Sequence, residues 1–313
     1  GSSGSDFRTA LVGALLSAGA DPNVFHEFDI DRLVLRVSIL AMACYYRRST
    51  SVTQLLDARA DVNMVSKEGE IFMDTPLIAA VFGKDVDIIK KLLASPNIDV
   101  NKPGLTGVTP LFTACMLNRA DIVQLLIEAR ANVNEANKYE DRRTPLDRVV
   151  SQDDGDRRIF EMLLSAGARL DVADAKGMTP LMIASEQANF DMVKLIVEKL
   201  KTTYGPDKLK AELVRRSSGP DPKTAVGWAL DHSLTAIKIA KFETEDELYE
   251  VYHNNYESAL HFACQLDSRE ERRELILSFW WDETDPYSLI ALAENRPDVA
   301  ELKHLIDLGA NVD

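Results

Sequence analysis

The phrase Thr75-Pro76-Leu77-Ile78-Ala79-Ala80 decides the fold of this chain, because it returns further along in nearly the same form. Two clear copies are Thr109-Pro110-Leu111-Phe112-Thr113-Ala114 and Thr179-Pro180-Leu181-Met182-Ile183-Ala184. Another copy begins with Thr144-Pro145-Leu146 but has Val149 where the others have alanine. Repetition of one phrase at a regular spacing is typical of proteins built from stacked, equivalent units.

Weaker copies of the phrase extend the pattern in both directions. They begin at Ser38, Thr224, Ser258 and Ser288, which gives eight copies with steps of 37, 34, 35, 35, 45, 34 and 30 residues. A second phrase, Leu-Leu-x-x-Gly-Ala-Asp-x-Asn in its fullest form, closes most copies. It is complete in residues 15–23 and recurs in residues 55–63, 125–134, 163–171 and 305–313.

Each part of these phrases has a physical reason. The hydroxyl of Thr or Ser caps a helix by accepting a bond from an N–H group that no helical carbonyl reaches. Proline fits the first helical position because that residue needs no N–H partner, and the small alanine lets neighbouring helices pack closely. Ile122, Val123, Leu125 and Leu126 form an apolar stripe at helical spacing. Each copy is therefore predicted to contain two short helices.

The pattern resembles the ankyrin-repeat family, whose unit of about 33 residues carries the signature Thr-Pro-Leu-His-x-Ala. The resemblance covers essentially residues 7–313, with eight in-phase copies and an N-terminal half copy. It implies an all-α solenoid of stacked helix-turn-helix units with finger loops. Such units cannot bury their apolar faces alone and fold only against their neighbours.

The residues that close the second helices depart from the family pattern in two copies. Gly19, Gly167 and Gly309 stand where a left-handed residue ends a helix. Arg59 and Arg130 replace this glycine in their own copies. We therefore expect these two helix ends to be strained or closed in another way.

The repeats indicate one solenoid over residues 6–313. Residues 1–5 resemble an expression-tag remnant and are set aside. About ten extra residues fall within residues 199–223, a locally basic stretch that either docks an acidic partner or is a tolerated insertion with a solvated face. The half copy at 6–23 and the end at Asp313 lead us to expect a fragment of a larger protein.

Composition excludes several kinds of partner. The chain has 313 residues, 46% of them apolar, and a formal net charge of −14. A negative field repels nucleic acid and anionic lipid, so no nucleic-acid partner is expected. The longest apolar stretch, residues 33–46, is interrupted by Arg36 and is too short to cross a bilayer. No membrane insertion is therefore expected.

The sequence offers no candidate for catalysis. Cys44, Cys115 and Cys264 each follow a signature alanine, and we interpret them as small core residues of a protein from a reducing compartment. An intracellular, cytoplasmic location is therefore expected. The histidines lack metal-ligand spacing, and no nucleotide-binding or nucleophile motif is present. We expect no enzymatic activity and assign no catalytic residue, cofactor or metal ligand.

The resemblance implies that a partner protein or peptide binds along the finger tips and the outward side of each first helix. These positions lie a few residues before each signature Thr and seven or eight after it. Their apolar side chains in the N-terminal copies are assigned to partner binding: Tyr45, Tyr46, Ile71, Phe72, Phe82, Leu105, Met116 and Leu117. A contiguous exposed apolar patch is typical of a partner site. The alternative is that the long fingers fold back and bury these residues.

Asp74 stands at such a position in the second copy. The two copies that follow the third carry mostly polar residues there, namely Arg143, Ser151, Gln152, Lys176, Met178, Glu186 and Gln187. The acidic, tyrosine-rich residues 242–257 could receive a basic partner, although a helix with a solvated charged side explains them more simply. The expected function is a non-catalytic protein–protein interaction module. The alternatives are a structural spacer of a larger complex, or the regulatory or targeting region of a multidomain enzyme or secreted effector. The oligomeric state is left open.

Overall fold

The computed structural model of the chain describes residues 3–30, 33–67, 74–138, 141–152, 155–187 and 189–205, with a few positions between 208 and 225. The chain divides into an N-terminal unit, Gly1–Arg169, and a C-terminal unit, Leu170–Asp313. The copies expected to begin at Thr224, Ser258 and Ser288 start outside the described residues.

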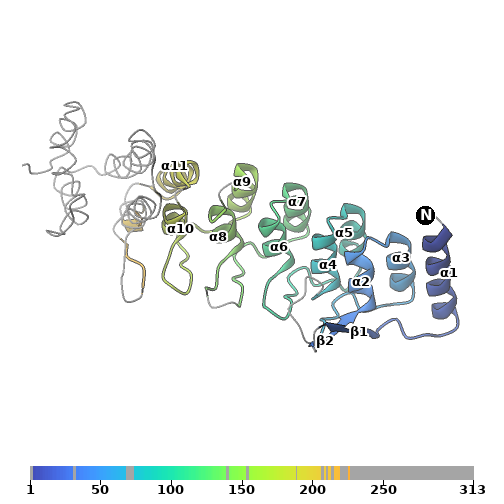
Figure 1. Cartoon of the computed structure of the whole chain (residues 1–313). Coiled ribbons are helices and arrows are strands. Elements are labelled where there is room, and N and C mark those ends of the chain that lie inside the picture. Colours follow the sequence, from blue (N-terminus) through green and yellow to red (C-terminus); the bar gives the residue numbers. More distant parts are fainter. Residues whose placement is uncertain are drawn as a thin grey trace, which may run out of the picture. The chain divides into compact units, whose positions relative to one another are not determined.

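Two rows of helices build the N-terminal unit (Figure 1). The first helices are α2 (Ile39–Tyr45), α4 (Pro76–Gly83), α6 (Pro110–Met116) and α8 (Pro145–Val150). The second helices are α3 (Ser49–Asp57), α5 (Val86–Leu93), α7 (Ala120–Glu128) and α9 (Arg157–Ser165), and α1 (Ser3–Ser17) packs against α3. Successive first helices contact one another in chain order, and each packs on the second helix of its own repeat. The predicted all-α, stacked helix-pair fold is confirmed.

One further helix pair is described in the C-terminal unit. Helix α10 (Pro180–Glu186) packs against α11 (Phe190–Lys199), which continues into a π-helical turn, η1 (Leu200–Tyr204). The helix α1 begins at Ser3, within the residues that were set aside as a tag remnant.

Every described first helix begins at the predicted capping residue. The side chains of Ser38, Thr75, Thr109, Thr144 and Thr179 each accept a hydrogen bond from the backbone N–H three residues later, at 3.1 to 3.5 Å. All but the first of these caps are followed by proline at the start of the helix. A cap of this kind stabilises a helix by about 1 kcal/mol, which matters for helices of only two turns.

The core lies between the two rows. In α4 the side chains of residues 77–81 are at most 2% exposed, because this helix has neighbours on both sides. In α7 a single stripe, Ile122, Val123 and Leu126, is fully buried, while Leu125 is half-buried. Each fully buried aliphatic side chain of this size contributes about 1.5 to 3 kcal/mol. Stacking therefore supplies most of the stability of helices too short to persist alone.

Two cysteines take the core positions predicted for them. Cys44 and Cys115 are free thiols with no exposed surface. Burial is the main reason that the pKa of both thiols lies far above its usual range. They stay protonated at neutral pH, so neither is a nucleophile. Cys264 lies outside the described residues.

The connection between Asn23 and Ser38 forms a β-hairpin. Strand β1 (Phe25–Ile30) pairs antiparallel with β2 (Leu33–Ser38), and Phe25 lies opposite Ser38. The next finger extends it, because the backbone N–H of Lys67 donates to the carbonyl of Arg36 at 2.8 Å and the reverse bond is 3.0 Å. The apolar stretch before α2 is therefore largely a strand.

A ladder of asparagines ties each repeat of the N-terminal unit to the next. Each asparagine side-chain oxygen accepts a bond from a backbone N–H of the following repeat: Asn23 from Asp61, Asn63 from Asp99, Asn101 from Asn132, and Asn134 from Arg169, at 2.7 to 3.0 Å. Three of these asparagines, Asn23, Asn63 and Asn134, close copies of the second repeated phrase. Their repetition therefore reflects a contact between repeats as well as a local turn.

The helix ends that lack glycine adopt the strained conformation expected for them. Gly19 and Gly167 have φ of 89° and 93°. Arg59 and Arg130 take the same place with φ of 62° and 66°, a region that glycine enters freely and other residues enter at a cost. Gly309 lies outside the described residues.

Candidate protein-binding surface

Five of the predicted binding residues lie at the carboxyl ends of three consecutive first helices. We call them the apolar row: Tyr45, Tyr46, Phe82, Met116 and Leu117. They end α2, α4 and α6, which follow one another in the stack (Figure 1). Tyr46 is 53% exposed and the other four are half-buried. The repeat pattern brings these residues, distant in sequence, to the same end of neighbouring helices.

Backbone contacts hold the helix ends of the row together. A methyl group placed on Gly83 would lie 2.9 Å from the carbonyl oxygen of Cys44 and 3.0 Å from that of Tyr45. Such distances are shorter than a carbon side chain tolerates, so α4 approaches α2 more closely than any residue but glycine allows. On the other side, Nε2 of Gln152 donates to the carbonyl of Met116 at 3.0 Å and fixes α8 against α6.

The two tyrosines at the N-terminal end of the row pack against each other. Their ring centroids are 5.3 Å apart with an interplanar angle of 88°, an edge-to-face arrangement. This geometry is favourable for aromatic pairs. Tyr45 is half-buried and holds the exposed Tyr46 in place. Tyrosine in such a setting is a frequent anchor in protein interfaces.

Leu105 lies apart from the row, on the finger that precedes α6. It is 47% exposed at the tip of a tight turn, in which the N–H of Gly104 donates to the carbonyl of Val108 at 3.0 Å. The exposure that was predicted for Leu105 is therefore present. Ile71 and Phe72, which were assigned to the preceding finger, lie outside the described residues.

Two residues at expected contact positions are instead buried. Asp74 is 4% exposed and Met178 is 1% exposed, so neither can meet a partner. Asp74 lies beneath the next finger, where its carboxylate abuts Gly104 and accepts a bond from the backbone N–H of Leu105. Burial raises the pKa of Asp74 to about 6, against the opposing effect of that hydrogen bond. In these two repeats the residue directly before the signature Thr is therefore buried and faces no partner.

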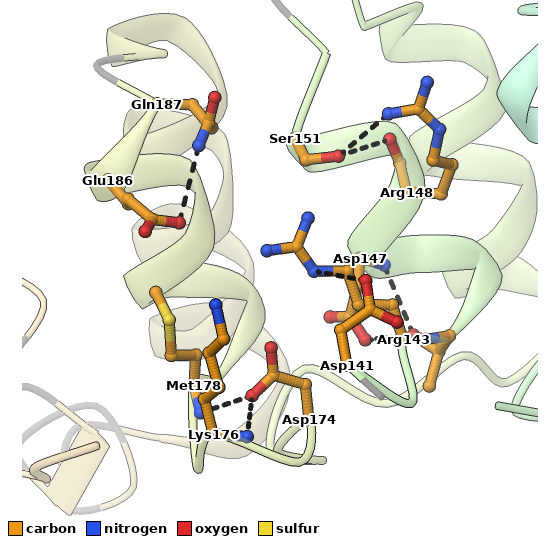
Figure 2. Close-up of polar contacts among 11 residues, drawn as sticks. Asp141, Arg143, Asp147, Arg148, Ser151, Asp174, Lys176, Met178, Glu186 and Gln187 are labelled. Carbon is orange, nitrogen blue, oxygen red and sulfur yellow. Dashed lines mark hydrogen bonds and ion pairs between the residues drawn. The ribbon is translucent and has the colours of Figure 1, made fainter. Parts of the chain in front are cut away.

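Around α8 the surface becomes polar (Figure 2). Nη1 of Arg148 donates to Oγ of Ser151 at 3.3 Å, and burial together with the charge of Arg143 lowers the pKa of Arg148. Arg143 lies 3.6 Å from a carboxylate oxygen of Asp141 on the same finger. The buried Asp147 completes a capping box with Thr144 and is structural. This repeat therefore lacks the apolar character of the three before it.

In the C-terminal unit the equivalent positions are also polar (Figure 2). The finger before α10 turns on Asp174, whose Oδ1 accepts from the N–H groups of Lys176 and Met178 at 2.9 Å. At the end of α10, Nε2 of Gln187 lies 3.4 Å from a carboxylate oxygen of Glu186. Like α8, this helix has no apolar side chain at the positions that form the row.

Two cations of the basic insertion within residues 199–223 form ion pairs within the chain. Lys208 Nζ lies 3.0 Å from the carboxylate of Asp171 and 3.5 Å from that of the buried Glu212. Arg215 Nη1 lies 3.3 Å from Glu212 Oε1 and donates to the carbonyl of Asp171 at 3.1 Å. These contacts favour the interpretation as an accommodated insertion over a basic docking element.

Sequence reasoning missed a set of cations beside the row, which we call the turn cations: Arg47, Arg48, Lys84 and Arg119. They lie in the turns between the first and second helices of three repeats. Arg47 and Lys84 come directly after the ends of the row's helices, one after Tyr46 and the other after Gly83, and have φ of 58° and 56°. Arg48 and Arg119 precede α3 and α7 and make no side-chain cap. The signal for Arg47 and Lys84 is their backbone conformation, because the residue that normally adopts a left-handed conformation is glycine and not a cation.

The negative charge of the chain is concentrated away from these repeats. Residues 226–313 contain 19 acidic and 7 basic residues, whereas residues 1–225 contain 31 and 29. The repeats that carry the row are therefore close to neutral. Repulsion of anions, which the whole-chain charge suggested, does not apply uniformly along the sequence.

The described residues contain no cluster of three or more His, Cys, Asp or Glu that could hold a metal ion. None of the described helices is long and apolar enough to cross a membrane.

Comparison with known sequences agrees with the architecture. Residues 39–137 and 77–174 match the family profile described as ankyrin repeats in three copies, and residues 176–201 match the profile of a single ankyrin repeat. The chain is 34% identical to the ankyrin repeat protein YahD of Escherichia coli over 164 residues, which are 51% of this chain and 74% of YahD.

Longer proteins contain similar stretches. Alpha-latrocrustotoxin-Lt1a of Latrodectus tredecimguttatus is 30% identical over 178 residues, 54% of this chain but 12% of the toxin. The glycerophosphocholine phosphodiesterase gde1 of Schizosaccharomyces pombe is 26% identical over 215 residues, 67% of this chain and 18% of that protein. The chain thus spans a small part of these two relatives and most of YahD. It belongs to the ankyrin-repeat family, whose repeats generally serve as protein–protein interaction modules.

Proposed function

We propose that this chain binds a partner protein or peptide across the apolar row and does not itself catalyse a reaction. The observation that carries the proposal is that three successive first helices, which contact one another in chain order, carry aromatic or aliphatic residues at their carboxyl ends. Tyr46, the most exposed member, lies at its N-terminal end. Partners of such surfaces are held by a few large apolar anchors surrounded by polar contacts.

The partial exposure of the row supports this function. Tyr46 is more than half exposed, so its ring is open to a partner. The close approach at Gly83 fixes the spacing of α4 from α2, and the side-chain bond from Gln152 holds the end of α6, before any partner arrives. Such a preformed surface binds with little loss of backbone freedom.

The direct experiment compares proteins captured from cells by the chain and by a Tyr46→Ala/Phe82→Ala variant. We expect specific partners to be lost from the variant while its unfolding transition shows that it remains folded. A Val24→Ala/Tyr204→Ala variant is the matched control, because both residues are exposed apolar side chains that do not belong to the row. Identical capture by the row variant and the control would refute the proposal.

A second candidate role is the repeat region of a larger multidomain protein. The observation that favours it is that the crustotoxin and the phosphodiesterase match this chain over only 12% and 18% of their own lengths. In that role the row would hold the partner or regulate activity located elsewhere in the same polypeptide. The sequence of the complete gene distinguishes this role from that of a self-contained adaptor.

A further inference from the structure

We infer that the partner segment carries acidic as well as large apolar side chains, and that its carboxylates meet the turn cations. This inference rests on the proposed function, because it assigns the chemistry of the ligand that the row would bind. The four cations are Arg47, Arg48, Lys84 and Arg119, in the three turns that directly follow the row.

Two of these cations occupy positions that are costly for the backbone. Arg47 and Lys84 have left-handed φ values of 58° and 56°, which cost a residue other than glycine about 1 to 2 kcal/mol. Burial does not repay this cost, since the Arg47 side chain is 66% exposed and Lys84 is exposed. Glycine would satisfy the same turn without strain. The backbone of these two turns would therefore be less strained with glycine than with the cations that are present.

The other two cations stand where a helix needs a capping acceptor. Arg48 and Arg119 are the residues before α3 and α7, and neither side chain caps its helix. In the repeat between them, Asp85 at the same position accepts bonds from the N–H groups of Asp87 and Ile88 at 3.2 and 3.1 Å. A cap of this kind is worth about 1 kcal/mol, which both arginines forgo.

The helix dipole favours a positive charge at only two of the four turn cations. Arg47 and Lys84 follow the carboxyl ends of α2 and α4, where a positive charge is favourable. Arg48 and Arg119 precede the amino ends of α3 and α7, where a positive charge is unfavourable. A purely structural role predicts cations after the carboxyl ends of helices and hydrogen-bond acceptors before their amino ends. Arg48 and Arg119 do not fit this expectation, because they are cations at the amino ends.

Internal anions do not balance these turns. Arg47 lies 3.7 Å from Asp85, and Arg119 forms a two-pronged pair with Asp121 at 2.9 and 2.6 Å. Arg48 and Lys84 have no ion-pair partner among the described residues. The excess of positive charge is local, since residues 1–225 as a whole contain 29 basic and 31 acidic residues.

The occupant that fits is a peptide segment in which carboxylates flank aromatic or aliphatic residues. The apolar members would contact the row, and the carboxylates would reach the cations that follow it in each repeat. A phosphate polymer such as DNA would satisfy the cations but offers no apolar side chains to the row. Charge complementarity of this kind mainly speeds association and discriminates between partners.

The test selects ligands from a random peptide library displayed on phage, with the intact chain as bait. We expect enriched peptides to be acidic and to contain aromatic or aliphatic residues, and to bind more weakly as salt is raised. Charge reversal by Arg47→Glu/Lys84→Glu should weaken their binding roughly tenfold or more at low salt. The control Lys90→Glu/Arg157→Glu changes the net charge equally on exposed second-helix positions and should leave binding unchanged.

A second variant separates binding from folding. Arg47→Gly/Lys84→Gly relieves the strained turns, so it should raise the unfolding temperature while it weakens peptide binding. A structural role for these cations cannot produce opposite changes in the two measurements.

The outcomes also distinguish this inference from the proposed function. The acidic-partner inference alone is overturned if the enriched peptides need Tyr46 and Phe82 but are neutral. It is also overturned if they bind the charge-reversed chain and the control chain equally tightly. The proposed function is contradicted as well if the selection enriches no peptide. The same holds if the enriched peptides bind the Tyr46→Ala/Phe82→Ala variant as tightly as the unmodified chain. Binding of an oligonucleotide that depends on the cations but not on the row also overturns the inference.

Discussion

Asn63 bonds to the following repeat through both ends of its side-chain amide. Its Oδ1 accepts from the backbone N–H of Asp99 at 2.8 Å, and its Nδ2 donates to the carbonyl of Asn97 at 2.6 Å. The stack is therefore held by directed bonds between neighbouring turns as well as by the apolar core.

Replacing Asn63 by alanine should lower the free energy of unfolding by about 1 to 2 kcal/mol, because two bonds between repeats are lost. Urea unfolding followed by circular dichroism measures this change. Asn97→Ala is the control, since that exposed side chain makes no such contact and only its backbone carbonyl is used. Equal effects of the two substitutions would mean that the ladder does not contribute to stability.

At the left-handed helix ends, a substitution to glycine should stabilise the chain and a substitution of glycine should destabilise it. Arg130→Gly should stabilise the chain by roughly 1 kcal/mol, because Arg130 has φ of 66° and glycine adopts this conformation without strain. Gly167→Ala should destabilise it by a similar amount, since φ is 93° and no atom lies within 4 Å to complicate the comparison. Thermal unfolding of both variants tests the pair, and changes of the same sign would contradict it.

Gly83 should tolerate no larger residue. Alanine favours a helix by about 1 kcal/mol over glycine, but its methyl group would press against two backbone carbonyls of α2. Overpacking of this kind costs about 1 to 3 kcal/mol, so we expect Gly83→Ala to be destabilising on balance. Gly13→Ala in α1 is the matched control, because its methyl group would meet only the mobile end of the Gln54 side chain. A Gly83→Ala variant more stable than Gly13→Ala would show that α2 and α4 can move apart.

The buried Asp74 predicts a dependence of stability on pH. Its pKa is raised to about 6 in the folded chain, so the folded state binds a proton more tightly than the unfolded state does. Stability therefore falls as pH rises from about 4 to about 6 and levels off above that range. Asp74→Asn removes this charge and should be more stable than the unmodified chain at pH 7, by about 2 kcal/mol.

The difference between the Asp74→Asn and unmodified chains should vanish below about pH 3, where the carboxyl group is protonated in both the folded and the unfolded state. Parallel denaturation series across this pH range provide the measurement. An advantage of the variant that is independent of pH would indicate that burial of Asp74 is compensated by other contacts.

Local interactions made most of the helices predictable from sequence. The caps at Thr75 and Thr109 join atoms three residues apart, so the phrase itself contains both partners. The strained ends at Arg59 and Arg130 followed from their register with Gly19. In each case the deciding contact lies within one repeat.

Features that depend on a neighbouring repeat were harder to predict. Asp74 occupies a position expected to face a partner, but the next finger covers it. The hairpin of β1 and β2 was missed because its apolar residues also suit a buried helix. The turn cations escaped notice because residue type alone does not reveal the backbone conformation at Arg47 or Lys84.

The most direct test of the apolar row replaces Phe82 with the photo-reactive residue p-benzoylphenylalanine in the intact chain and irradiates living cells. If the row binds a partner, a discrete covalent adduct should form at this position. The same residue in place of Tyr204, an exposed apolar position outside the row, should give none. Absence of an adduct at position 82, or the same adducts at both positions, would contradict the assignment of this surface.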